Sequence, residues 1–132
     1  MTREAIVLAL ALGLSACGGT TYAVAGEAPA TGADATIEVS ESDNSQRVSI
    51  HVSHLPPPDR VAPGMTRYSV WIIPTGLSPV LAGTLRYDAG EREGAIDVLT
   101  PHETFEVIVT AQNDPLPLAP SDVVVLREYI SS

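Results

Sequence analysis

The sequence has one cysteine, no lysine and few aromatic side chains, which make up 5% of its 132 residues. Because Cys17 is the only thiol, no disulfide can form within the chain, and an apolar core has to hold the fold. Seven arginines are opposed by 16 acidic residues, which gives a net charge of −9 at pH 7. Since phosphate backbones repel such a chain, the charge argues against nucleic acid as a partner.

Catalytic motifs are also missing from the sequence. It contains no G-x-S-x-G nucleophile elbow, no phosphate-binding loop and no dinucleotide fingerprint. The carboxylates of Asp88, Glu91 and Glu93 lie in one polar loop, but they lack the alternating oxygen ligands of an EF-hand. That loop is therefore predicted to be a solvated hairpin connection. We expect neither an enzyme nor a bound cofactor.

The apolar run over residues 5–14 is too short to cross a bilayer, because a spanning helix needs roughly 20 apolar residues. Its length is typical of the apolar region of a secretory signal. The small residues Ser15 and Ala16 follow and leave room for a peptidase at the backbone. Cys17 comes next, and its thiolate is the best nucleophile a protein offers for forming a thioether.

The motif formed by Leu14, Ser15, Ala16 and Cys17 resembles the lipobox of bacterial lipoprotein signal peptides. The resemblance implies that residues 1–16 are cleaved and that Cys17 is acylated, which makes membrane lipid one partner. Gly18 stands where an Asp favours retention in the inner membrane, so the expected place is the cell envelope, at the periplasmic face of the outer membrane. The alternative is a buried apolar helix with an incidental core cysteine.

Residues 17–35 are predicted to form a flexible tether, because this segment is rich in Gly, Ala, Thr and Pro and lacks periodicity. From residue 36 onward, short stretches alternate between apolar and polar residues and are separated by turn signals. We predict that residues 36–132 form one all-β domain, a seven-stranded sandwich of the immunoglobulin or fibronectin type III kind. The predicted strands cover residues 36–41, 47–55, 66–74, 80–88, 95–100, 104–112 and 123–130.

Residues 97–114, DVLTPHETFEVIVTAQND, resemble a corner between two strands of fibronectin type III modules. Phe105 departs from the family pattern, because a tyrosine usually stands there and its hydroxyl ties the corner. The wider stretch from Tyr68 to Leu126 is similar to the extracytoplasmic β domain of sigma-K-type membrane-bound anti-sigma factors. Because no cytoplasmic segment is expected here to bind a sigma factor, this second resemblance implies the fold alone. The corner matches at Leu99, Pro101, Thr104, Phe105, Val107, Val109, Ala111 and Asn113.

The strand around Trp71 offers a candidate interaction surface, and two arrangements are open. If Tyr68 and its alternating neighbours face the core, then Trp71, Ile73 and Ile108 form an exposed apolar strip of the kind that marks partner surfaces. In the opposite register Trp71 packs inside, as in immunoglobulin domains. We favour burial of Trp71 and keep the strip as the candidate site.

His51 and His54 are the nearest approach to a metal motif, with His102 as a distant third ligand. Because side chains alternate along a strand, ligands three residues apart point to opposite faces unless a bulge intervenes. The leading expectation is therefore a non-enzymatic, lipid-anchored envelope protein that binds another envelope protein or takes part in envelope assembly. The alternative is a periplasmic copper or zinc carrier that uses these histidines.

Overall fold

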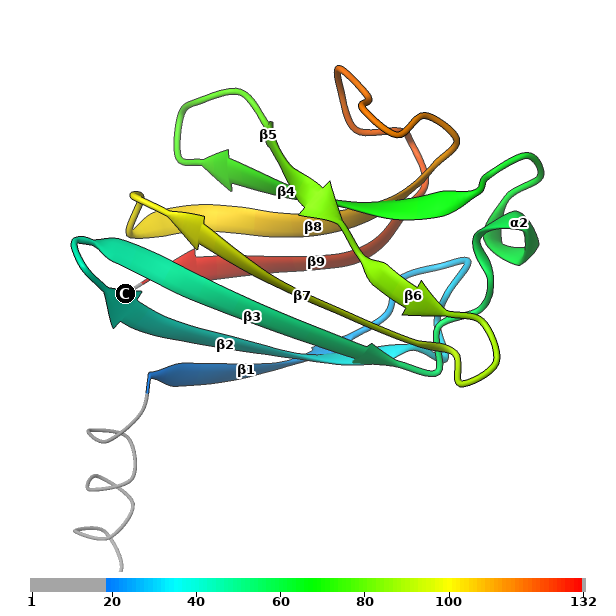
Figure 1. The fold of residues 1–132 in the computed structure, drawn as a ribbon, viewed down its shortest axis with the longest axis horizontal. Coiled ribbons are helices and arrows are strands. Elements are labelled where there is room, and N and C mark those ends of the chain that lie inside the picture. The colour runs from blue at the N-terminus through cyan, green and yellow to red at the C-terminus, as the bar shows by residue number, and fades with distance from the viewer. Residues whose placement is uncertain (1–18, 132) are drawn as a thin grey trace, which may run out of the picture.

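The computed structural model describes residues 19–131, and the lipobox with Cys17 lies outside this range. Two antiparallel sheets pack face to face around one apolar core (Figure 1), which confirms the predicted all-β sandwich. One sheet has five strands in the order β1-β2-β3-β7-β6, and the other has four in the order β5-β4-β8-β9. The strands are β1 Thr20–Ala25, β2 Asp34–Ser42, β3 Ser45–Ser53, β4 Arg67–Pro74, β5 Val80–Thr84, β6 Arg86–Asp88, β7 Glu93–Thr100, β8 Thr104–Gln112 and β9 Val124–Ser131, and a short helix, α2, spans Pro58–Val61.

Alternating side chains place the core where the sequence predicts it. Val48, Ile50 and Val52 of β3 are buried between the sheets, whereas His51 is exposed on the outer face. The central strand β4 is buried on both faces over most of its length, as its nearly continuous apolar sequence indicates. Each buried Val or Ile stabilises the fold by about 1.5–3 kcal/mol relative to an exposed one.

The residues that the structure describes form nine strands rather than the predicted seven. One added strand arises because the predicted strand 80–88 changes sheets midway: β5 pairs with β4, and β6 pairs with β7. Leu85 makes the crossing, with its side chain buried and its amide donating to the Tyr68 carbonyl oxygen at 2.9 Å. Gly94 faces this crossing, and a Cβ there would lie only 2.4 Å from Leu85 Cδ2.

The other added strand, β1, overturns the predicted tether. Thr20–Ala25 pairs with β2 along its whole length, and the following turn buries Ala30 and Ala33. The Glu27 amide donates to the Val125 carbonyl oxygen at 2.8 Å, which joins the turn to β9 of the other sheet. Because backbone pairing holds β1 and only Val24 of the strand is buried, its side chains give a weak strand signal.

Two tyrosines fix the connection between β3 and β4. The hydroxyl of Tyr68 donates to the Pro56 carbonyl oxygen, and that of Tyr87 donates to the Leu55 carbonyl oxygen at 2.5 Å. Their rings meet edge to face with centroids 5.4 Å apart. Burial raises the pKa of both hydroxyls, and the negative charge that an ionised Tyr87 would carry raises the pKa of Tyr68 further. These contacts tie down a loop for which the sequence predicts only irregular structure.

Candidate functional site

The candidate strip of Trp71, Ile73 and Ile108 is not exposed. Trp71 is 1% exposed and Ile108 is 4% exposed, while Ile73 is half-buried. Tyr68 and the other alternate residues of β4 do face the core, so Trp71 lies on the outer face of the four-stranded sheet as the strip hypothesis requires. The favoured burial of Trp71 is therefore confirmed. The side chain is buried on the outer face of the sheet, however, and not in the core between the sheets.

A chain of hydrogen bonds satisfies the buried indole N–H of Trp71. Trp71 Nε1 donates to Thr110 Oγ1 at 3.0 Å, and the Thr110 hydroxyl donates to Gln112 Oε1 at 2.7 Å. The Ser121 amide donates to the same Gln112 oxygen at 2.7 Å. Because a buried indole N–H needs an acceptor, the network lets Trp71 occupy this face without an unsatisfied donor.

The same network fixes the base of the loop between β8 and β9, residues 113–123, here named the β8–β9 loop. Ser121 Oγ donates to the Ala111 carbonyl oxygen at 2.6 Å and accepts the Val123 amide at 3.1 Å. The Ala111 amide in turn donates to the Val123 carbonyl oxygen at 2.9 Å. Three prolines restrict the backbone further, and one of them, Pro117, is buried. The loop is thus held in place from both ends.

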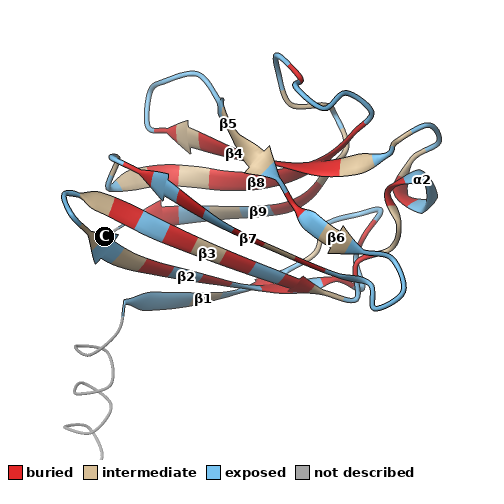
Figure 2. Ribbon diagram, viewed as in Figure 1, coloured by how far each residue is buried: buried red, intermediate tan, exposed pale blue. Residues whose placement is uncertain are grey.

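The tip of the β8–β9 loop presents two leucines to solvent. Leu116 is 75% exposed and Leu118 is 100% exposed, and most of the loop is exposed in Figure 2. Asp114 Oδ1 accepts the Leu116 amide at 3.0 Å, which shapes the turn before the first leucine. Two exposed leucines this close together make the loop tip a candidate contact surface for a partner.

This surface lies at the end of the sandwich opposite the start of β1 (Figure 1). β1 begins at Thr20, which pairs with Val39 close to the β2–β3 turn. The β8–β9 loop instead follows Gln112, which pairs with Arg67 at the beginning of β4. A membrane anchor attached before β1 therefore leaves the two leucines on the far side of the domain.

The histidines predicted as metal ligands do not come together. His54 Nδ1 lies 2.8 Å from Asp34 Oδ1, and His51 Nε2 lies 3.8 Å from Glu93 Oε1, all four side chains being well exposed. His102 follows the opposite end of β7 from the end that pairs with His51. Over residues 19–131, no three His, Cys, Asp or Glu side chains are grouped to hold a metal ion.

Sequence analysis missed Leu116 and Leu118, although a signal for them exists. The stretch Pro115–Leu116–Pro117–Leu118 places apolar residues where proline prevents a regular strand or helix, so these side chains have no sheet face to pack under. Within the described part of the chain, no helix is long and apolar enough to span a membrane. No protein-family model matches this chain, and no curated protein matches it significantly.

Proposed function

We propose that this chain is a non-enzymatic, lipid-anchored envelope protein that binds another envelope protein through the β8–β9 loop. The lipobox-like motif ending at Cys17 supports the anchor, and the pair Leu116 and Leu118 supports the binding role. The place we propose is the periplasmic face of the outer membrane, as the Gly after Cys17 suggests.

The full exposure of Leu118 on a fixed loop is the observation that carries this proposal. Burying one leucine in a partner contributes about 1.5–3 kcal/mol. A loop already ordered by the Gln112 network loses little conformational entropy on binding, so more of that contribution appears as affinity.

The strand order supports a finer assignment of the fold. In the order β2-β3-β7-β6 one sheet matches strands A-B-E-D of an immunoglobulin domain, and β4-β8-β9 matches C-F-G, with β5 as an added edge strand. On this assignment the β8–β9 loop is the F–G loop. In immunoglobulin variable domains the F–G loop belongs to the end of the sandwich that binds ligands.

Charge indicates what kind of pocket the leucines fit. Asp114 and Asp122 are both exposed and flank the loop tip on either side, and the whole chain is strongly acidic. Opposite charges around an apolar contact speed association and exclude wrong partners. The proposed partner therefore has an apolar pocket surrounded by basic side chains.

A photocrosslinking amino acid placed at position 118 in intact cells tests the proposal. We expect one envelope protein to be captured from position 118, and the same capture to fail when Leu116→Ser is added. The matched control is position 77, because Leu77 is also an exposed leucine but belongs to the loop between β4 and β5. Equal capture of the same protein from positions 77 and 118 would refute a role for the loop.

A further inference from the structure

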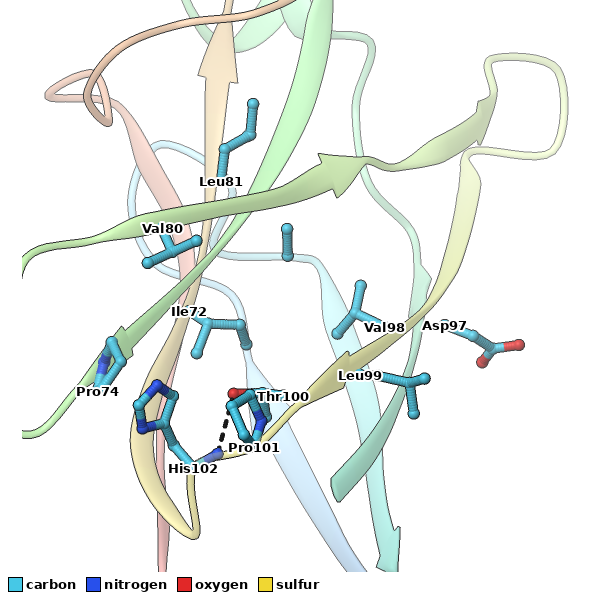
Figure 3. A pocket seen from close by; sticks show the side chains of 11 residues that line it. Ile72, Pro74, Val80, Leu81, Asp97, Val98, Leu99, Thr100, Pro101 and His102 are labelled. Atoms are coloured by element: carbon cyan, nitrogen blue, oxygen red, sulfur yellow. Dashed lines mark hydrogen bonds between the residues drawn. The ribbon is translucent and has the colours of Figure 1, made fainter. Parts of the chain in front are cut away.

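A cleft of about 470 Å³ opens between β5 and β7, on the other side of the sandwich from β1 (Figure 3). Ile72 and Val98 point into it, one from each sheet, whereas Asp97 points away to the outer face. Val80 lines the rim and is 56% exposed. Eight of the eleven lining residues are apolar, so the cleft suits apolar side chains.

The cleft exists because the chain changes sheets at Leu85. β6 pairs only with residues 93–95 of β7, and β5 has already joined the other sheet. In the part of the chain that is described, residues 96–100 of β7 therefore have no strand beside them on the side away from β3. An unpaired edge of this length, about 17 Å, presents N–H and C=O groups ready to pair with another strand.

On the opposite side of the sandwich the two sheets are linked to each other, although β1 and β9 are edge strands too. There, β1 continues the sheet past β2, and the turn after it donates from Glu27 to the Val125 carbonyl oxygen. Arg127 adds an ion pair to Glu27 at 3.6 Å. These contacts hold the two sheets together on that side, whereas on the β5–β7 side the sheets leave the cleft between them.

We propose that the free edge of residues 96–100 in β7 accepts an extended segment of a partner protein as an additional strand. The segment would continue the line of β6, with backbone hydrogen bonds to β7 supplying affinity. Every second side chain would enter the cleft against Ile72 and Val98, and these positions would be apolar. This inference rests on the proposed function, to which it adds a second contact and a class of partner segment.

Charge and position define the partner segment more closely. The side chains between the apolar ones would lie on the outer face beside Asp97 and the exposed Leu99, and none of the cleft's eleven lining residues is an arginine. With a net charge of −9, a second copy of this chain is a poor occupant, whereas a segment with Lys or Arg beside Asp97 is favoured.

The cleft is also near the proposed anchor. It opens at the end of β7 that pairs with the start of β3, and β1 begins at this same end of the sandwich (Figure 1). Cys17 precedes Gly19 by two residues, which reach about 7 Å at most. An acylated Cys17 would therefore hold the cleft close to the bilayer, and the partner segment is one that lies near the membrane surface.

A random library of displayed 12-residue peptides, selected on the full lipidated protein in detergent, tests this proposal. We expect the enriched peptides to carry apolar residues at alternate positions with Lys or Arg between them. Ala82→Trp fills the cleft, and Val80→Trp does so from an exposed position that the fold tolerates. Either variant should weaken the best peptide at least tenfold, whereas Thr36→Trp, exposed on β2, should leave binding unchanged.

Hydrogen exchange then locates the bound peptide. A synthetic copy of the best peptide should slow exchange of the amides in residues 96–100 and leave those of Thr20–Ala25 unchanged. No enrichment, equal binding to the filled variants, protection elsewhere, or dimers of the chain paired through this edge would overturn the inference. If the peptide still binds Leu116→Ser while crosslinking from position 118 is lost in that variant, the loop proposal and the cleft proposal stand or fall separately.

Discussion

At the scale of single residues, buried hydroxyl and indole groups decide which surfaces the fold can display. The hydroxyls of Tyr68 and Tyr87 donate to the carbonyl oxygens of Pro56 and Leu55, respectively, and hold the loop that leads into β4. Trp71 is held through Thr110 by the network that also fixes the β8–β9 loop. These buried hydrogen-bonding groups therefore hold two loops in position.

Stability should fall at alkaline pH because burial raises the pKa of Tyr68 above its usual value near 10. A raised pKa in the folded state favours the protonated form, so its contribution is complete below about pH 10 and is lost as the pH rises beyond that value. Tyr68→Phe should lower the unfolding free energy by about 1–2 kcal/mol at pH 8 and flatten the decline above pH 10. Urea titrations between pH 8 and 11 measure the unfolding free energy of Tyr68→Phe, with Tyr129→Phe as the exposed control. If the unfolding free energy of Tyr68→Phe fell above pH 10 as steeply as that of the unmodified chain, Tyr68 would not be the group responsible.

Trp71 is the only tryptophan, so its fluorescence reports on one site. Its burial predicts blue-shifted emission that acrylamide quenches poorly. Thr110→Val removes the acceptor of the indole N–H and should cost about 1–3 kcal/mol while making the emission easier to quench. Red-shifted and readily quenched emission in the unmodified protein would mean that the exposed strip exists after all.

At the scale of elements, the sequence predicts those strands whose burial follows a simple alternation. β3 and β8 were placed to within a few residues because Val48, Val52, Val107 and Val109 all point to one core. The sheet change at Leu85 was not predicted, since it depends on contacts with Tyr68 and Gly94 that are distant in sequence. The burial of Trp71 on the outer face could not be predicted for the same reason, because the acceptor of its indole N–H, Thr110, lies 39 residues away.

Gly94 should be required at the crossing from β5 to β6. Gly94→Ala would bring a Cβ to 2.4 Å from Leu85 Cδ2, and Leu85 is buried and has little room to move. We expect a loss of about 1–3 kcal/mol in unfolding free energy, the usual cost of overpacking. Gly32→Ala is the matched control, because a Cβ at Gly32 meets nothing within 4 Å. Equal unfolding midpoints for the two variants would show that the crossing tolerates a side chain there.

At the scale of the whole molecule, the proposed anchor and the exposed leucines lie at opposite ends of one rigid sandwich. Strand β1 leaves only Gly18 and Gly19 between Cys17 and the sheet, so the domain would sit against the bilayer instead of on a long tether. The β8–β9 loop would then project away from the membrane, and the β5–β7 cleft would lie close to the membrane surface. Two contacts at different heights above the bilayer suit a protein that connects others within the envelope.

Intact-mass spectrometry of the protein from bacterial membranes tests the anchor. We predict a chain that begins at Cys17 and carries acyl groups, and Cys17→Ala should abolish both the acylation and the cleavage. Recovery of the chain with Met1 in place and a free thiol would contradict the proposed location.

The central claim is that Leu116 and Leu118 bind a partner protein, and an equilibrium titration measures it most directly. The protein captured from position 118 is titrated with the lipidated chain and with its Leu116→Ser/Leu118→Ser variant in the same detergent. Because each leucine contributes about 1.5–3 kcal/mol when buried, the double variant should bind at least about 100-fold more weakly. Leu77→Ser should bind like the unmodified chain, and a double variant within threefold of it would contradict the account.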